Sequence, residues 1–233
     1  PSGPEGSSGK QWISGAVGPP GSSRFPVVRL RERSNRRCTA CQPQPICPHL
    51  DVTTPSARPK KSLGQHFLVD RRVLSRISAA AEISSDDVVV EIGPGRGVLT
   101  KHLAERASRV VAVELDEALA NWLSDDLADR PNVEVVCADA REVDLARLVR
   151  PDTPYKVAAN LPYYAALPIL RRFLEAEHKP ELMAVMVQRE VGRKIAAAPG
   201  GMGLVSVAVQ LYGRPRIVSY VPPRAFRPAP TVT

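Results

Sequence analysis

Short apolar runs alternate with amphipathic stretches along the chain from about residue 60 onward. The apolar runs are rich in β-branched residues and lie at 88–93, 110–114, 133–139, 156–160 and 182–188. Between the first three runs, residues 97–107 and 116–128 carry apolar side chains at helical spacing. A further helix is predicted over 70–81, with Asp70 as its N-cap. Continuous apolar strands separated by helices predict an α/β fold, in which helices cover both faces of a parallel sheet.

The ends of the first three strands carry residues that suit a nucleoside, and ligands of parallel sheets bind at these carboxyl ends. The first strand runs into Gly93-Pro94-Gly95-Arg96-Gly97, whose spacing differs from the dinucleotide-binding and P-loop patterns. Glu114 ends the second strand, where a carboxylate can accept hydrogen bonds from ribose hydroxyls. Asp139 ends the third, where it can accept from an adenine amino group. Either acid alone is typical of a solvated strand end, but with the glycine loop they predict a nucleoside site without a pyrophosphate.

The first 60 residues differ in composition from the rest of the chain. They contain 10 Pro, 6 Gly and 8 Ser, without a strand or helix period. We therefore expect residues 1–57 to be a disordered extension and residues 58–233 to form the folded domain. The Arg-rich, acid-poor run at 24–37 weakly resembles an organelle transit segment. Because the sequence starts at Pro1 and its first methionine is Met183, we expect it to be processed or truncated.

Charge, hydropathy and cysteine content narrow the class of protein. The 32 Lys and Arg exceed the 24 Asp and Glu mainly within residues 1–60, so net charge is weak support for a nucleic-acid partner. No run reaches the roughly 18 apolar residues of a membrane span, so no membrane partner is expected. Cys38, Cys41, Cys47 and His49 are possible zinc ligands, but no strand or helix brackets them, and chance clustering is favoured over a metal site. Cys137, inside an apolar run, is expected to be buried.

The fourth apolar run ends in Asn160-Leu161-Pro162-Tyr163, and several further segments carry a family resemblance. They are KKSLGQHFLVD at 60–70, VEIGPGRGVLT at 90–100, NLPYY at 160–164, VMVQREVGRKI at 185–195 and VPPRAFRPAPTV at 221–232. Together these segments resemble the ribosomal RNA adenine N6,N6-dimethyltransferases, enzymes that use S-adenosyl-L-methionine and modify small-subunit ribosomal RNA. The resemblance covers residue 58 to the end of the sequence.

The resemblance implies a Rossmann-like, S-adenosylmethionine-dependent methyltransferase sheet with helices on both faces. In the family this sheet has seven strands, the last one reversed, and a small helical domain follows it. The sequence stops within residues 227–233, whose motif leads into the last strand in the family. We therefore expect residues 58–233 to be a methyltransferase catalytic domain truncated at its C-terminal end, with the helical domain missing and an open sheet edge.

The resemblance also implies which residues bind the cofactor. The matching positions are His66, Leu68, Gly93, Gly95, Glu114, Asp139 and Asn160. Gly93 would approach the methionine part, Glu114 the ribose and Asp139 the adenine. The sequence departs from the family at His66 and Tyr164, where Asn is usual, and at Met202, where Tyr is usual. The first departure concerns a cofactor contact, and the others concern the edge of the base pocket.

The chemistry expected at Asn160-Leu161-Pro162-Tyr163 is activation of an adenine N6 amino group, which is a poor nucleophile. The Asn160 side-chain oxygen and the Leu161 carbonyl can each accept one N6 hydrogen and so aim the nitrogen lone pair at the methyl group. Pro162 stiffens the loop, and Tyr163 offers a face on which the base can stack. The catalysis would then consist of positioning and dipole placement.

The expected function is dimethylation of adenines in small-subunit ribosomal RNA, in support of ribosome biogenesis. The partner is the RNA or a pre-ribosomal particle, and the candidate contacts are Phe67, Arg189, Arg193, Lys194, Arg214, Arg216, Arg224 and Arg227, around the pocket mouth. The protein is expected to be cytoplasmic, or in an organelle if residues 1–57 are a transit segment, and a monomer. Two alternatives remain, a resistance-type methyltransferase of large-subunit RNA and a non-catalytic RNA-binding or transcription factor on the same fold.

Overall fold

The computed structural model describes residues 25–32, 66–162 and 164–229. The strands are β1 (Phe25–Glu32), β2 (Phe67–Leu68), β3 (Val88–Ile92), β4 (Arg109–Glu114), β5 (Val133–Cys137), β6 (Tyr155–Asn160), β7 (Leu182–Met186), β8 (Gly213–Val221) and β9 (Phe226–Arg227). The helices are α1 (Arg71–Ala80), α2 (Val98–Ala104), α3 (Glu117–Asp126), α4 (Leu145–Leu148), α5 (Ala166–Leu174), α6 (Arg189–Ile195) and α7 (Leu204–Tyr212).

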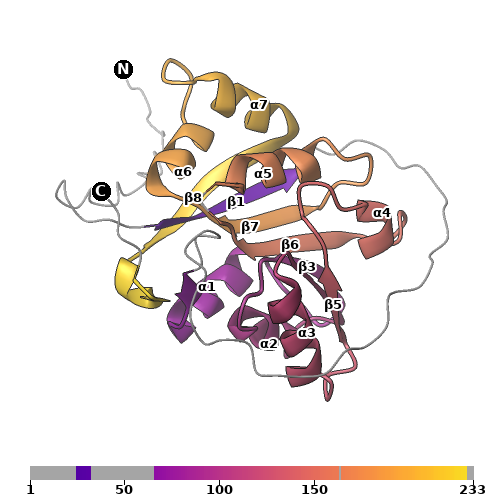
Figure 1. The fold of residues 1–233 in the computed structure, drawn as a ribbon. Coiled ribbons are helices and arrows are strands. Elements are labelled where there is room, and N and C mark those ends of the chain that lie inside the picture. The colour runs from indigo at the N-terminus through magenta and orange to yellow at the C-terminus, as the bar shows by residue number, and fades with distance from the viewer. Residues whose placement is uncertain (1–24, 33–65, 163, 230–233) are drawn as a thin grey trace, which may run out of the picture.

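The five strands predicted from apolar runs are β3 to β7, each within two residues of its predicted bounds. They belong to a seven-stranded sheet in the order β5-β4-β3-β6-β7-β1-β8 (Figure 1). The pairs among β3 to β7 are parallel, as predicted. Asp70 caps α1 by accepting a hydrogen bond from the Arg72 amide at 2.9 Å, which confirms the predicted helix start.

Strand β1 corrects the prediction that residues 1–57 are disordered throughout. It lies between β7 and β8 and is antiparallel to both, so the reversed strand of this sheet comes from the N-terminal region. Val27, Val28 and Leu30 are at most 1% exposed. The local run FPVVRLRE is short, and the Pro, Gly and Ser content around it hid its strand character. The prediction of an open sheet edge is therefore wrong for β7, since β1 pairs with it. The other residues of 1–57 lie outside the described ranges.

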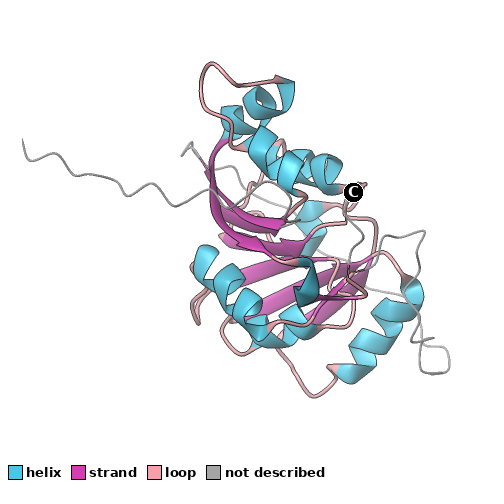
Figure 2. Cartoon of the chain, turned by 90° about the vertical axis from the view of Figure 1, so that its left-hand side faces the viewer, coloured by secondary structure: helices cyan, strands magenta, loops and turns pink. Residues whose placement is uncertain are grey.

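Helices cover both faces of the sheet, which gives the molecule three layers (Figures 1 and 2). On one face, α1 and α2 pack onto the strands through Val73, Ile77 and Leu103. On the other face, α4 to α7 enclose a second core that contains Leu170 and Phe173 of α5. Alternate strand residues point into the two cores, as a buried parallel sheet requires.

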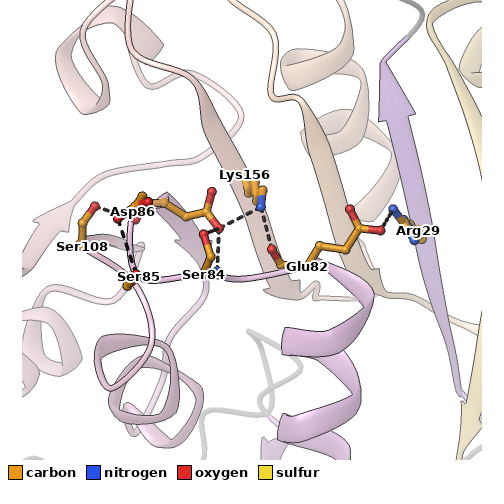
Figure 3. Close-up of polar contacts among 8 residues, drawn as sticks. Arg29, Glu82, Ser84, Ser85, Asp86, Ser108 and Lys156 are labelled. Atoms are coloured by element: carbon orange, nitrogen blue, oxygen red, sulfur yellow. Dashed lines mark hydrogen bonds and ion pairs between the residues drawn. The ribbon is translucent and has the colours of Figure 1, made fainter.

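A polar network joins β1 to the amino ends of the parallel strands (Figure 3). Arg29 of β1 forms an ion pair with Glu82, which follows α1. The main-chain oxygen of Glu82 accepts a hydrogen bond from Lys156 Nζ of β6 at 2.6 Å. Lys156 also pairs with Asp87, directly before β3, at 2.7 Å. These contacts join β1, the segment between α1 and β3, and β6, which are distant in sequence. They lie on the side of the sheet away from the carboxyl ends of the parallel strands.

Cys137 is exposed, which contradicts the prediction that it is buried. Its strand β5 is the edge strand of the sheet, and the other residues of β5 are only half-buried. An apolar run therefore formed a strand as predicted, but its position in the sheet left it partly uncovered. Among the described residues, no helix combines the length and apolar character needed to cross a membrane.

Candidate functional site

The glycine loop after β3 lies at the carboxyl edge of the sheet. Gly93 and Gly95 have φ angles of 67° and 56°, in the left-handed region that favours glycine. A Cβ atom on Gly95 would lie 2.9 Å from the ring of Phe67. Glycine at this position therefore allows the segment before α1 to close over the loop. The Arg96 guanidinium lies 4.7 Å from the centre of the same ring, on its face.

Glu114, the last residue of β4, is an oriented hydrogen-bond acceptor. Its Oε2 accepts from the Gly95 amide at 3.0 Å and its Oε1 from the Asp116 amide at 3.0 Å. Burial raises the pKa of Glu114, and these main-chain hydrogen bonds act in the opposite direction. Each carboxylate oxygen has two lone pairs. The main-chain amides of Gly95, Leu115 and Asp116 therefore fix this carboxylate in the pocket wall, where it can accept from a polar group of a ligand.

Asp139 follows β5 and is held by one neighbouring residue. The Arg141 guanidinium contacts both of its carboxylate oxygens, and the Arg141 amide donates to Oδ1. The side-chain hydrogen bond from Arg141 is the largest cause of the lowered pKa of Asp139. Asp139 is consequently an anionic acceptor that already has a cationic partner.

Glu91 is a buried carboxyl that the sequence reasoning did not assign to the site. It lies in β3, is 1% exposed, and contributes to the lining of the pocket. Burial is the largest cause that raises the pKa of Glu91 to about 8, while the nearby Thr100 hydroxyl lowers it and Glu114 raises it further. Its Oε2 has no hydrogen-bond partner among the described residues. The signal in the sequence was a single acid inside the apolar run VVVEI.

Asn160 ends β6 and contacts the segment that precedes α1. Its Nδ2 donates to the main-chain oxygen of His66 at 3.2 Å. Because a carbonyl oxygen can only accept, this contact assigns the amide NH2 to the His66 side and leaves Oδ1 on the other. The next residue, Leu161, donates its amide to the Met186 oxygen at 3.2 Å. His66 itself contacts the Pro228 oxygen through Nδ1 at 3.0 Å.

These side chains surround one pocket at the carboxyl ends of the parallel strands β3 to β7. The predicted site residues that line it are His66, Leu68, Gly93, Gly95, Glu114, Asp139, Asn160, Leu161 and Pro162. Tyr163, also predicted, lies outside the described residues. Sequence reasoning missed Leu115, which lines the pocket and is 43% exposed. The signal was an apolar residue directly after the acid that ends β4.

The basic residues proposed for RNA contact do not all lie at the pocket. Arg189, half-buried, begins α6 directly after β7, near the pocket edge. Arg193, Lys194, Arg224 and Arg227 are exposed. The prediction is wrong for Arg214 and Arg216, because both lie in the first half of β8.

This half of β8 pairs with the end of β1, and Arg216 is opposite Arg29. That end of the sheet carries the Arg29–Glu82 pair, away from the carboxyl ends where the pocket opens. No group of three or more His, Cys, Asp and Glu in the described ranges has the geometry to hold a metal ion. The segment with Cys38, Cys41, Cys47 and His49 lies outside these ranges.

Comparison with known proteins gives consistent matches to enzymes that methylate ribosomal RNA. A chain named ribosomal RNA small subunit methyltransferase A from Dehalococcoides mccartyi strain 195 is 47% identical over 175 residues, which are 75% of this chain and 60% of that protein. A protein of the same name from Alkaliphilus metalliredigens is 46% identical over 177 residues, or 74% and 62% of the two chains. The chain thus spans about three-fifths of the length of these curated relatives.

Two solved structures match with a TM-score of 0.64. The 23S rRNA methyltransferase ErmE is 34% identical, with 71% of this chain and 66% of that chain covered. A dimethyladenosine transferase from Plasmodium falciparum is 27% identical, with 72% and 60% covered. The sequence model described as Ribosomal RNA adenine dimethylase matches residues 56–233. This match covers the whole pocket and confirms the resemblance seen in the sequence, so the chain belongs to the ribosomal RNA adenine dimethylase family.

Proposed function

We propose that this chain carries the cofactor-binding and methyl-transferring part of an enzyme that dimethylates adenine N6 groups in small-subunit ribosomal RNA. The observation that carries the proposal is the convergence of nine predicted site residues on one pocket. Seven come from the ends of the parallel strands β3, β4, β5 and β6, and two from the segment around β2. The names of the curated relatives support the small subunit as the source of the RNA.

The residues of the pocket fit S-adenosyl-L-methionine. Glu114 is held in place by main-chain amides and lines the pocket, where its carboxylate can accept a hydrogen bond from a ribose hydroxyl. Gly93 and Gly95 adopt left-handed φ angles, which let the main chain turn sharply where it forms the pocket wall. Glu91 presents a buried oxygen without a partner, which a polar group of the ligand would satisfy. When bound, the cofactor supplies an electrophilic methyl group on a sulfonium.

The residues of this chain would activate the nucleophile by position alone. The His66 carbonyl holds the amide NH2 of Asn160, so Oδ1 is the atom that would accept one N6 hydrogen of the target adenine. The Leu161 carbonyl would accept the other hydrogen, which aims the N6 lone pair. Pro162 restricts the loop between them. No side-chain nucleophile is needed, and the rate enhancement would come from preorganised dipoles and alignment.

The target adenine would have to leave its stack to enter this pocket. Tyr163 is the proposed stacking face. Arg189, Arg193, Lys194, Arg224 and Arg227 are the proposed phosphate contacts, and Phe67, which lies under Arg96, is a weaker candidate. We propose that the RNA is recognised free or within a pre-ribosomal particle, that the protein acts as a monomer, and that its compartment is the cytoplasm.

Methylation of large-subunit RNA is a second candidate, favoured by the likeness to the 23S rRNA methyltransferase. The test is transfer of labelled methyl from S-adenosylmethionine to small-subunit and large-subunit particles that lack these modifications. We expect label in N6,N6-dimethyladenine of the small subunit, and loss of label with Asn160→Ala. Label in the large subunit alone would support the second candidate. Cofactor binding without transfer to either RNA would contradict both proposals and favour a non-catalytic RNA-binding role.

A further inference from the structure

Arg141 contacts both carboxylate oxygens of Asp139. Oδ1 accepts from the Arg141 amide at 2.9 Å and from its Nε at 3.0 Å. Oδ2 accepts from the same Nε at 3.0 Å and from Nη2 at 2.5 Å. These contacts come from three N–H groups, because the single hydrogen of Nε is shared between the two oxygens. An adenine amino group therefore competes with the Arg141 side chain for this carboxylate.

The Arg141 side chain can leave at low cost, whereas its main-chain contact can stay. The guanidinium side chain is 43% exposed and the Asp139 side chain 21%, so solvent screens their attraction. The Arg141 amide belongs to the turn that follows β5, and its hydrogen bond to Oδ1 does not depend on the side chain. Of the donors now on Asp139, the side chain is the one that adenine would replace.

A released guanidinium would lie at the mouth of the pocket. Arg141 lines the pocket together with Asp139 and Tyr164. Tyr164 is 51% exposed and follows the Asn160–Pro162 loop, where the proposed target base enters. While Arg141 is paired with Asp139, its charge is neutralised. Once it is released, an uncompensated positive charge faces the path of the RNA strand, and a guanidinium binds phosphate with two parallel hydrogen bonds.

We propose that Arg141 couples the two ligands: the adenine of the cofactor displaces its side chain from Asp139, and the displaced side chain then binds a phosphate of the target RNA. This inference rests on the proposed function. Cofactor binding raises RNA affinity, and by linkage RNA raises cofactor affinity by the same factor. Arg141 is thus a positioning residue outside the methyl-transfer chemistry.

The test uses the whole 233-residue chain, the non-reactive product S-adenosylhomocysteine, and a fluorescent single-stranded RNA with unpaired adenines. RNA affinity is measured by anisotropy with and without saturating S-adenosylhomocysteine, whose own binding is measured by calorimetry. In the wild type we expect S-adenosylhomocysteine to raise RNA affinity about five-fold or more. In Arg141→Gln this gain should disappear, and S-adenosylhomocysteine should bind more tightly because its competitor is gone. With S-adenosylhomocysteine present, RNA affinity should fall less steeply with salt in the mutant. The slope of log K against log salt concentration should be smaller in magnitude by about 0.7, the value for one lost phosphate contact on a single strand.

Arg147→Gln is the matched control, because Arg147 is also an exposed arginine paired with a nearby acid, Asp144, but does not line the pocket. It should keep the wild-type coupling and the wild-type affinity for S-adenosylhomocysteine. Coupling that persists in Arg141→Gln, or weaker S-adenosylhomocysteine binding in that mutant, overturns the role of Arg141. Wild-type binding of S-adenosylhomocysteine without any effect on RNA overturns it while leaving the proposed function intact. No binding of S-adenosylhomocysteine to the wild type overturns both.

Discussion

The side-chain amide of Asn160 donates a hydrogen bond to the main-chain oxygen of His66 at 3.2 Å, across 94 residues of sequence. It joins the end of β6 to the segment that enters β2, and β2 in turn pairs with β9. The same side chain therefore closes the pocket wall and, in the proposed reaction, offers its remaining oxygen to the substrate.

We expect Asn160→Ala to reduce methyl transfer about 10²- to 10³-fold, because it removes one preorganised acceptor from the transition state. Cofactor affinity should change much less than turnover. Asn132→Ala is the control, because the Asn132 amide also donates to main-chain oxygens, those of Ala104 and Ala107, but lies outside the pocket. Single-turnover transfer of labelled methyl measures the effect. Equal rates for the two variants would contradict the role of Asn160.

Replacement of Glu114 should weaken cofactor binding. Hydrogen bonds to a charged group contribute about 1.5–3 kcal/mol, so calorimetry should show affinity for S-adenosylhomocysteine about 10- to 100-fold lower in Glu114→Gln. Glu134→Gln, on the neighbouring strand β5, removes a carboxylate that pairs with Arg109 instead and should bind as the wild type does. If both variants bind equally well, Glu114 does not hold the ribose.

Glu91 should make the fold less stable as pH rises. Burial raises its pKa from 4.5 to about 8, so the folded chain keeps a proton that the unfolded chain releases between these values. The stability contribution is complete below the unfolded pKa and is lost as pH rises through the folded pKa. Over that range the free energy of unfolding should fall by up to about 1.4 kcal/mol per pH unit from this group.

Urea unfolding of Glu91→Gln, followed by circular dichroism across the same pH range, checks this expectation. Glutamine keeps the shape of the side chain and cannot ionise, so the fall of stability with pH should become shallower in this variant. Glu105→Gln, at an exposed position after α2, should keep the wild-type slope. A wild-type slope in Glu91→Gln would mean that Glu91 is ionised in the folded chain.

Strand β1 should behave as part of the core. Leu30→Ala deletes a side chain that is 1% exposed, and such deletions cost about 2–5 kcal/mol of unfolding free energy. Arg31→Ala, at the next and exposed position, should cost far less. Chemical denaturation of both variants measures the difference. Indistinguishable stabilities would mean that residues 25–32 do not belong to the sheet.

The sequence by itself determined the elements whose signals are local. The runs that became β3 to β7 are apolar over their own lengths, and Asp70 caps α1 through a hydrogen bond only two residues away. Three predicted parts of the site lie at or just after strand ends, namely the glycine loop, Glu114 and Asp139. Parallel strands bring their carboxyl ends to the same side of the sheet. The sequence alone therefore predicts that residues far apart along the chain line one pocket, as they do in the structure.

Only the tertiary structure decided features that depend on which segments become neighbours. Val28 and Leu30 gain their burial from β7 and β8, which lie more than 150 residues further along the chain, and from the helices that cover this face. Cys137 is exposed because its strand became the edge of the sheet. Arg216 lies far from the pocket because β8 starts at the opposite end. Burial and proximity are set by packing between distant segments, and no local pattern encodes that packing.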